Sequence, residues 1–256
     1  MKKFLFLLYG VVTYVIFFGT FCYALGFVTE LFVPKHISSP ALVQVKWPWL
    51  LNAALLGIFA IQHSVMARPG FKQWWTKFVP EPIERTTYVL ITCILLIAMF
   101  YLWQPVGGEI WNVQDPVLSS ILIGISLIGG VIVLISTFII NHFDLFGLRQ
   151  VWLQFRGKPY TDVKFVKRSF YKYIRHPLLF GFLVLFWFTP YMTVAHLVFA
   201  LLTTGYIFVA LIFEERDLLH AHGEDYRKYQ QDVPQIIPFT KRKSKDHGVP
   251  VRQSQW

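Results

Sequence analysis

Four short polar stretches of this sequence carry side chains that can move a proton or hold a charged ligand. In chain order these side chains are His142, Asp144, Arg149, Tyr171, Arg175, His176, Glu214 and Glu215. His142 can serve as a general base, with Asp144 two positions later as the carboxylate that orients it and Arg149 as a nearby cation. The two cysteines, Cys22 and Cys93, have no metal-ligand spacing, so we expect no metal site.

Each of these residues also has a plainer interpretation when it is taken alone. Arg175 can be an ordinary anchor at a membrane interface, and Glu214 can begin a solvated helix. Pro177 can simply start a membrane span, where its missing N–H would be unpaired anyway. If these residues form no functional site, the plainer interpretation must be correct for all four stretches at the same time. Their grouping at one membrane face, derived below, favours a site.

The composition excludes an ordinary soluble protein. Of the 256 residues, 55% are hydrophobic, 18% are aromatic and only 15% are charged, whereas roughly 25% of an average soluble protein is charged. The charged residues are gathered in short clusters that separate long uncharged runs, as expected when segments must cross hydrocarbon. The sequence therefore predicts a polytopic membrane protein.

Five uncharged apolar runs position the polar stretches. The runs are Phe4–Thr29, Trp47–Ala67, Thr86–Gln104, Pro116–Phe143 and Pro177–Phe213. Each of the first four can cross about 30 Å of hydrocarbon as a helix. The last run has 37 residues and is interrupted at Pro190, so it predicts a helical hairpin whose first span is short. The fold class that we expect is an all-α membrane bundle of about six transmembrane helices.

The positions of the 24 Lys and Arg residues predict the orientation of the bundle. With six spans, 22 of these residues fall on one side of the membrane, and only Lys35 and Lys46 fall on the other. Cytoplasmic loops carry such an excess of positive charge, so we expect both termini and all four polar stretches to face the cytoplasm. A single span in place of the hairpin would remove this asymmetry. The distribution explains the net charge of +10 without nucleic acid.

We expect one integral membrane domain over residues 1–239, with the chemistry concentrated in residues 142–239. Residues 240–256 are a basic segment, which we expect to be a disordered cytoplasmic tail. The sequence has no Gly-x-Gly-x-x-Gly turn between a strand and a helix, so we expect no Rossmann domain.

The second half of the sequence carries an ordered set of motifs. They are Tyr171-x3-Arg175-His176-Pro177-x3-Gly181, Glu214-Glu215-Arg216-Asp217-Leu218, Gly223-Glu224-Asp225-Tyr226-x2-Tyr229 and Val233-Pro234. In order and spacing this set resembles the isoprenylcysteine carboxyl methyltransferase superfamily of membrane enzymes. Upstream segments narrow the resemblance to the bacterial methanethiol S-methyltransferases. Those segments are His63–Pro69, Trp74-Trp75, Glu84–Tyr88 and His142–Gln150.

The resemblance implies transfer of a methyl group from S-adenosyl-L-methionine to a small thiol. Methanethiol, which gives dimethyl sulfide, is the expected acceptor, and hydrogen sulfide, which gives methanethiol, is a further one. By position in the motifs, the cofactor residues are Lys164, Val166, Tyr171, Arg175, His176, Pro177, Leu178, Leu179, Glu214 and Glu215. Glu214 is preferred to Glu215 as the carboxylate that contacts the cofactor. Leu179 stands where the family usually has tyrosine, so the hydrogen bond of that tyrosine is not expected here.

Methyl transfer of this kind joins a thiolate to a sulfonium cation, and both charges disappear as the bond forms. A dry pocket favours the reaction, because water stabilises the separated ions more than the less polar transition state. A thiol is mostly protonated at neutral pH. We therefore expect His142 to take the thiol proton, Asp144 to orient His142 and Arg149 to stabilise the thiolate.

Three other functions fit parts of the same pattern. The first keeps the enzyme class but replaces the thiol with a prenylcysteine or lipid carboxylate. The second is a membrane sterol reductase with a nicotinamide cofactor, and the third is a non-enzymatic membrane protein of the related denitrification-associated family. Binding of S-adenosylhomocysteine separates the methyltransferases from the other two. For the methyltransferase we expect a multi-pass protein of the bacterial inner membrane, with the thiol and the bilayer as partners and no protein partner.

Overall fold

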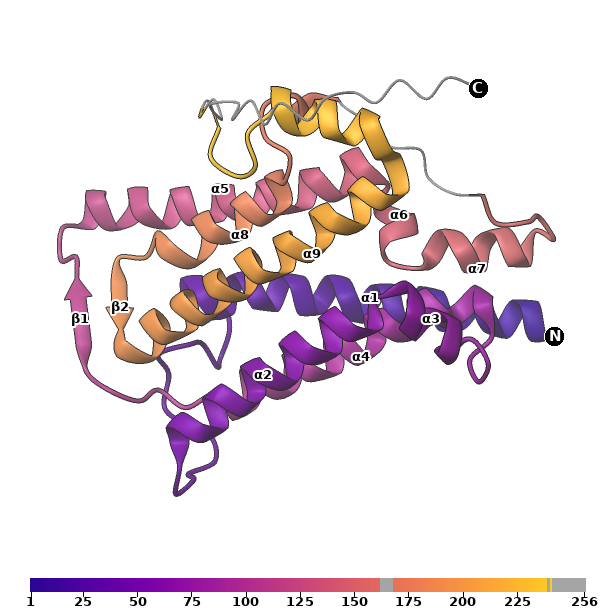
Figure 1. The fold of residues 1–256 in the computed structure, drawn as a ribbon. Helices are drawn as coiled ribbons and strands as arrows, with labels where there is room; N and C mark the ends of the chain where they lie inside the picture. The colour runs from indigo at the N-terminus through magenta and orange to yellow at the C-terminus, as the bar shows by residue number, and fades with distance from the viewer. Residues whose placement is uncertain (162–167, 239, 241–256) are drawn as a thin grey trace.

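The computed structural model describes residues 1–161, 168–238 and 240 of the chain (Figure 1). The elements in chain order are α1 (Lys2–Thr29), α2 (Pro48–Met66), α3 (Pro69–Trp75), α4 (Glu81–Leu102), β1 (Glu109–Asn112), α5 (Pro116–Ile140), α6 (His142–Leu145), α7 (Leu148–Phe155), the 3₁₀ turn η1 (Ser169–Lys172), α8 (Pro177–Trp187), β2 (Tyr191–Thr193) and α9 (Val194–Asp232). The predicted helical fold class is confirmed. Lys164, Val166 and the predicted tail from residue 241 onward lie outside the described residues.

Within the described residues, five helices are long and apolar enough to cross a membrane: α1, α2, α4, α5 and α9. The predicted hairpin is present as α8 followed by α9. Its first helix has 11 residues, which span about 16 Å at 1.5 Å per residue and fall well short of the hydrocarbon thickness. Proline occupies the first turn of α2, α3, α4, α5 and α8, where its missing N–H leaves no helical bond unmade.

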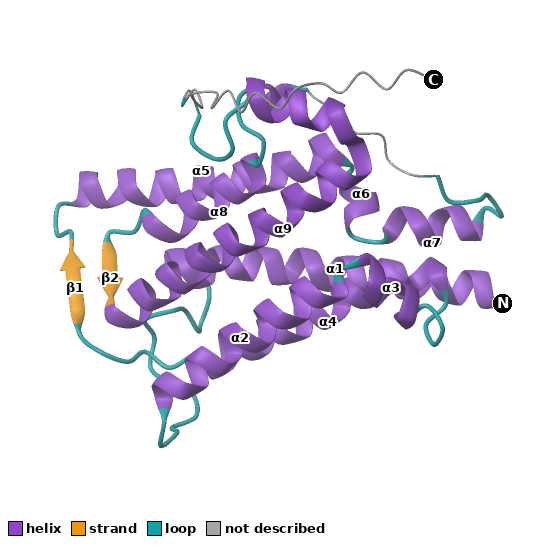
Figure 2. Ribbon diagram, viewed as in Figure 1, coloured by secondary structure: helices purple, strands orange, loops and turns teal. Residues whose placement is uncertain are grey.

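A small antiparallel sheet, which the sequence did not predict, joins two connections that lie far apart in the chain (Figure 2). Strand β1 lies between α4 and α5, and β2 forms the turn of the α8–α9 hairpin. Glu109 pairs with Thr193 and Asn112 with Tyr191. The indole of Trp111 also donates to the carbonyl of the hairpin turn at Thr189, 3.0 Å away. Both connections therefore lie at the same end of the bundle.

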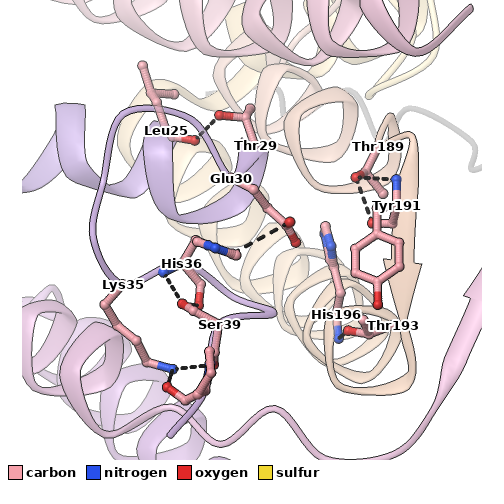
Figure 3. Close-up of polar contacts among 11 residues, drawn as sticks. Leu25, Thr29, Glu30, Lys35, His36, Ser39, Thr189, Tyr191, Thr193 and His196 are labelled. Carbon is pink, nitrogen blue, oxygen red and sulfur yellow. Dashed lines mark hydrogen bonds and ion pairs between the residues drawn. The ribbon is translucent and has the colours of Figure 1, made fainter. Parts of the chain in front are cut away.

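The bundle has two chemically different ends (Figure 1). The sheet end holds β1, β2 and the segment 30–47, in which polar contacts fold the chain back on itself (Figure 3). There the buried Lys35 ammonium donates to the carbonyl of Ser39 at 2.9 Å, and His36 lies 3.5 Å from the Glu30 carboxylate. The basic end holds the N-terminus, α3, α6, α7 and the start of α8. All four polar stretches belong to this end.

Helices α5 and α8 pack with their backbones in close approach. A Cβ atom on Gly129 would lie 2.6 Å from the carbonyl oxygen of Gly181, so only glycine fits at this crossing. The hydroxyl of Ser126 donates to the carbonyl of Leu185 at 2.8 Å. These contacts place α8 along the middle of α5, which extends further towards the basic end than α8 does. Within the basic end, the start of α8 therefore lies short of the level at which α5 ends (Figure 1).

Candidate functional site

Arg175 and His176, immediately before α8, are almost fully buried, with 3% and 6% of their surface exposed. Pro177 starts the helix, and the two preceding backbone amides pair with the segment that follows α9. The amide of Arg175 donates to the carbonyl of Pro234 at 2.9 Å, and the amide of His176 donates to the carbonyl of Gln235 at 3.1 Å. The predicted motifs at the two ends of the hairpin are therefore joined through the backbone.

Glu215 neutralises the buried arginine. One of its carboxylate oxygens lies 2.7 Å from Nε of Arg175 and 3.1 Å from Nε2 of His176. The other oxygen accepts from the side-chain amide of Gln230 at 3.1 Å. Arg175 also donates to the carbonyl of Val233 at 2.6 Å. Both oxygens of Glu215 are thus engaged by protein donors, and the residue holds α8, α9 and the closing segment together.

Glu214 is in a different environment from its neighbour. Its side chain is 52% exposed, against 12% for Glu215. Its one ion-pair contact in the described part of the chain is with Nδ1 of His176, 3.5 Å away. Burial raises the pKa of Tyr171, and the negative charge of Glu214 raises it further, which indicates that the Tyr171 side chain lies close to this carboxylate. Glu214 is therefore free to receive a cationic ligand beside Tyr171 and His176.

The remaining predicted cofactor residues near this site belong to the first turn of α8. Pro177 is buried, and Leu178 and Leu179 are partly buried. Leu179 packs against the apolar cluster of Ile207, Leu211 and Ile236. Leu179 therefore contributes to the apolar contact between α8 and α9. Lys164 and Val166 lie outside the described residues.

His142 is enclosed by aromatic rings and is only 2% exposed. Its ring stacks on Phe138 with a centroid distance of 4.0 Å. Nε2 lies 2.7 Å from the hydroxyl of Tyr14, and Nδ1 lies 2.7 Å from the hydroxyl of Thr137. Because the Thr137 hydroxyl donates to the carbonyl of Leu134, it must accept from Nδ1–H, so Nε2 accepts from Tyr14. Burial lowers the pKa of His142, which keeps the ring neutral near pH 7.

The predicted pairing of Asp144 with His142 is wrong. The carboxylate of Asp144 binds Arg149 at 2.8 Å and the hydroxyl of Tyr160 at 3.2 Å. Residues two apart on a helix do not face each other, and α6 places these two side chains on different sides. Arg149 also donates to the carbonyl of Thr161 at 2.8 Å. Asp144 therefore neutralises the charge of Arg149, and these contacts hold the guanidinium within this loop.

Sequence reasoning missed Tyr14 and Thr137, the two partners of His142. Thr137 precedes His142 by five residues, so its spacing offered a weak signal at the end of α5. Tyr14 lies on α1, 128 residues away, and no local pattern could have identified it. A long-range aromatic contact of this kind depends on the packing of α1 beside α5 and α6.

A second polar cluster links α2 to α4 and α9 inside the bundle. The hydroxyl of Tyr88 lies 2.9 Å from Nδ1 of His63, and the hydroxyls of Ser64 and Tyr206 lie 3.1 Å apart. Nearer the basic end, Arg68 pairs with Asp217. Through these contacts His63 and Ser64 hydrogen-bond across helices, as polar side chains within membrane bundles commonly do.

Comparison with known proteins gives one consistent result. The family model described as NnrU protein matches residues 50–235. The methanethiol S-methyltransferase of Crocosphaera subtropica is 52% identical over 238 residues, which cover 93% of each chain. That of Mycobacterium tuberculosis is 48% identical over 242 residues, covering 94% of this chain and 99% of the relative. Methanethiol S-methyltransferase 1 of Bradyrhizobium diazoefficiens is 48% identical over 237 residues, covering 93% of this chain and 83% of the relative. No solved structure matches.

The different environments of the two glutamates predict different effects on stability. Glu215→Gln leaves the buried Arg175 charge without its counterion, and we expect a loss of about 3–5 kcal/mol. Glu214→Gln is the matched control, and we expect little change because this side chain is half exposed. Thermal unfolding of both variants in detergent measures the difference. Equal melting temperatures for the two variants would contradict the assignment of Glu215 to the buried ion pair.

Proposed function

Because the chain belongs to the NnrU family and to the methanethiol S-methyltransferases, we infer that it transfers the methyl group of S-adenosyl-L-methionine to methanethiol and produces dimethyl sulfide. The observation that carries the assignment to this site is the half-exposed carboxylate of Glu214 beside Tyr171 and His176. When bound, S-adenosyl-L-methionine supplies a methyl group activated by a sulfonium cation. A half-exposed carboxylate next to an arginine that is already neutralised fits such a cationic ligand.

We propose that different residues of the hairpin have different roles in binding the methyl donor. Arg175 and Glu215 hold the start of α8 against α9 and fix the position of His176. Glu214 provides the negative charge for the donor, and the partly buried Tyr171 closes the site on the side of η1. Pro177, Leu178 and Leu179 supply the backbone and the apolar wall of the first turn of α8. Lys164 and Val166, which precede this motif in the sequence and lie outside the described residues, complete the cofactor residues that we propose.

The thiol must lose its proton for the transfer to proceed. The thiol sulfur forms the new S–C bond as the S–C bond of the donor breaks, and the opposite charges of thiolate and sulfonium cancel. We assign the proton to His142, reached through Tyr14. The hydroxyl oxygen of Tyr14 receives the thiol proton as its own proton passes to Nε2 of His142. Support for this route comes from the neutral ring, its 2.7 Å contact with Tyr14, and the greater exposure of Tyr14.

The orientation that we propose has six crossings, with both termini and the site on the cytoplasmic side. Twenty-two of the 24 Lys and Arg residues then face the cytoplasm. The two connections that this scheme puts outside, 105–115 and 188–193, hold β1 and β2, and their pairing in one sheet supports it. Helix α8 alone is too short to cross the hydrocarbon, and in this scheme the polar segment before it completes the crossing on the cytoplasmic side.

Headspace gas chromatography tests the proposed reaction directly. The purified chain in lipid nanodiscs, given S-adenosyl-L-methionine and methanethiol, should release dimethyl sulfide, and omission of the methyl donor should stop the release. A chain that binds S-adenosylhomocysteine but methylates a prenylcysteine in place of methanethiol would assign the acceptor to the lipid class. A folded chain that binds no S-adenosylhomocysteine would refute the methyltransferase itself.

The proton route predicts a specific dependence on pH. His142→Ala should bind S-adenosylhomocysteine normally but lose roughly 100-fold in turnover near pH 7. The defect should shrink as the pH rises, because more of the thiol then arrives as thiolate and needs no base. Tyr14→Phe should share this profile, whereas Asp144→Asn should not, since Asp144 pairs with Arg149. An equal loss of turnover at every pH in a folded His142→Ala enzyme would exclude His142 as the base and would indicate that it has a packing role.

The orientation can be tested by labelling single cysteines in intact cells. In a chain without Cys22 and Cys93, Asn112→Cys in β1 should react with a membrane-impermeant maleimide added outside. Glu224→Cys, on the exposed part of α9, should react only after the cells are opened. The reverse pattern would contradict the proposed orientation, and labelling of both positions from the same side would contradict the six crossings.

A further inference from the structure

A polar cavity of about 730 Å³ lies at the basic end between α3 and α4 on one side and α6 and α7 on the other. The charged side chains of its lining are those of Lys72, Glu81, Glu84, Arg85, Asp144 and Lys158. The proposed donor site is separate from it, because neither the Arg175–His176 motif nor Glu214 contributes to the lining. The cavity is therefore not explained by the methyl-transfer reaction.

Two enclosed acceptors among the lining residues lack a donor. The Oε1 atoms of Glu84 and Gln150 are inaccessible to solvent and have no hydrogen-bond partner in the part of the chain that the structure describes. The amide nitrogen of Gln150 already donates to the carbonyl of Asp144 at 3.1 Å, which directs its oxygen elsewhere. Buried acceptors of this kind are costly unless a ligand supplies N–H groups. A primary ammonium carries three N–H bonds and can donate to more than one such acceptor.

The cavity also offers cations for an anionic group. No hydrogen bond or ion pair joins the ammonium of Lys72 or Lys158 to a residue in the described ranges. Burial and the nearby charge of Arg85 lower the pKa of Lys72, whereas Glu84 and Asp144 act in the opposite direction. An anion beside Lys72 would relieve the repulsion from Arg85. Positive and negative side chains are balanced in the lining, so the ligand that fits best carries both charges.

The surroundings of the cavity indicate where such a ligand comes from. Helices α3 and α7 follow the ends of membrane-spanning helices and carry exposed aromatic residues, among them Trp74 and Trp152. Aromatic side chains of this kind gather at the level of the lipid headgroups. The cavity is also lined by Ile140 and Leu153, which can contact the glycerol and the upper acyl chains.

We propose that this cavity binds the headgroup of a phospholipid that carries a primary ammonium and a phosphate, of the phosphatidylethanolamine type. The ammonium donates to Glu84 and Gln150, and the phosphate is held by Lys72 and Lys158. The bound lipid links α3 and α4 to α6 and α7 at the membrane surface.

Native mass spectrometry of the delipidated chain with defined lipids tests the proposal. Phosphatidylethanolamine should be retained at least tenfold more strongly than phosphatidylcholine with the same acyl chains, which has the same charges but no N–H donors. Phosphatidylglycerol, which lacks the ammonium, should also be retained weakly. Equal retention of the ethanolamine and choline lipids would overturn the proposal. If soluble phosphoethanolamine bound as tightly as the lipid, the site would belong to a free metabolite and the lipid assignment would fall.

Variants locate the binding within the chain. Glu84→Ala combined with Gln150→Ala should lower ethanolamine-lipid retention to the choline level, and Lys158→Gln, at an exposed position, should weaken it without affecting folding. Glu109→Ala, on the exposed strand at the sheet end, is the control and should retain the lipid normally. Unchanged retention in a folded Lys158→Gln chain and in the double variant would contradict this site.

Discussion

The buried charge of Arg175 is the constraint on which the organisation of the site depends. An arginine that is 3% exposed in a membrane protein needs a counterion, and Glu215 supplies it from α9. This ion pair fixes the crossing of the hairpin helices near the basic end and draws the segment after α9 back over the start of α8. It also leaves the adjacent Glu214 unpaired by arginine. One residue of the glutamate pair thus maintains the structure, and the other remains available for a ligand.

The short length of α8 places this ion pair within the bundle. Close packing of Gly129 against Gly181 holds α8 along the middle of α5, so the motif before α8 is set back from the level at which α5 ends. The sheet at the other end secures the hairpin turn against the connection between α4 and α5. For the reaction that we propose, a set-back polar motif surrounded by apolar helices would provide the low-dielectric surroundings that favour the cancellation of the thiolate and sulfonium charges.

Much of this organisation could be predicted from the sequence, because hydrophobic run length and basic-residue placement are local signals. The same holds for the motif order around Arg175 and Glu214. The contacts that were missed, such as Tyr14 with His142, depend on packing between helices that are distant in the chain. Asp144 was paired with His142 from sequence proximity, but a spacing of two does not bring helical side chains together. The roles of adjacent glutamates could not be separated, since burial is decided by the helix crossing.

The proposal that Glu214 faces the positive charge of the methyl donor can be tested by comparing ligands that differ in that charge. Isothermal titration would measure the affinities of S-adenosyl-L-methionine and of the uncharged thioether S-adenosylhomocysteine for the unaltered chain and for Glu214→Gln. Glu214→Gln should lose at least tenfold more affinity for the sulfonium ligand than for the thioether. An equal change for the two ligands, or no change for either, would contradict it.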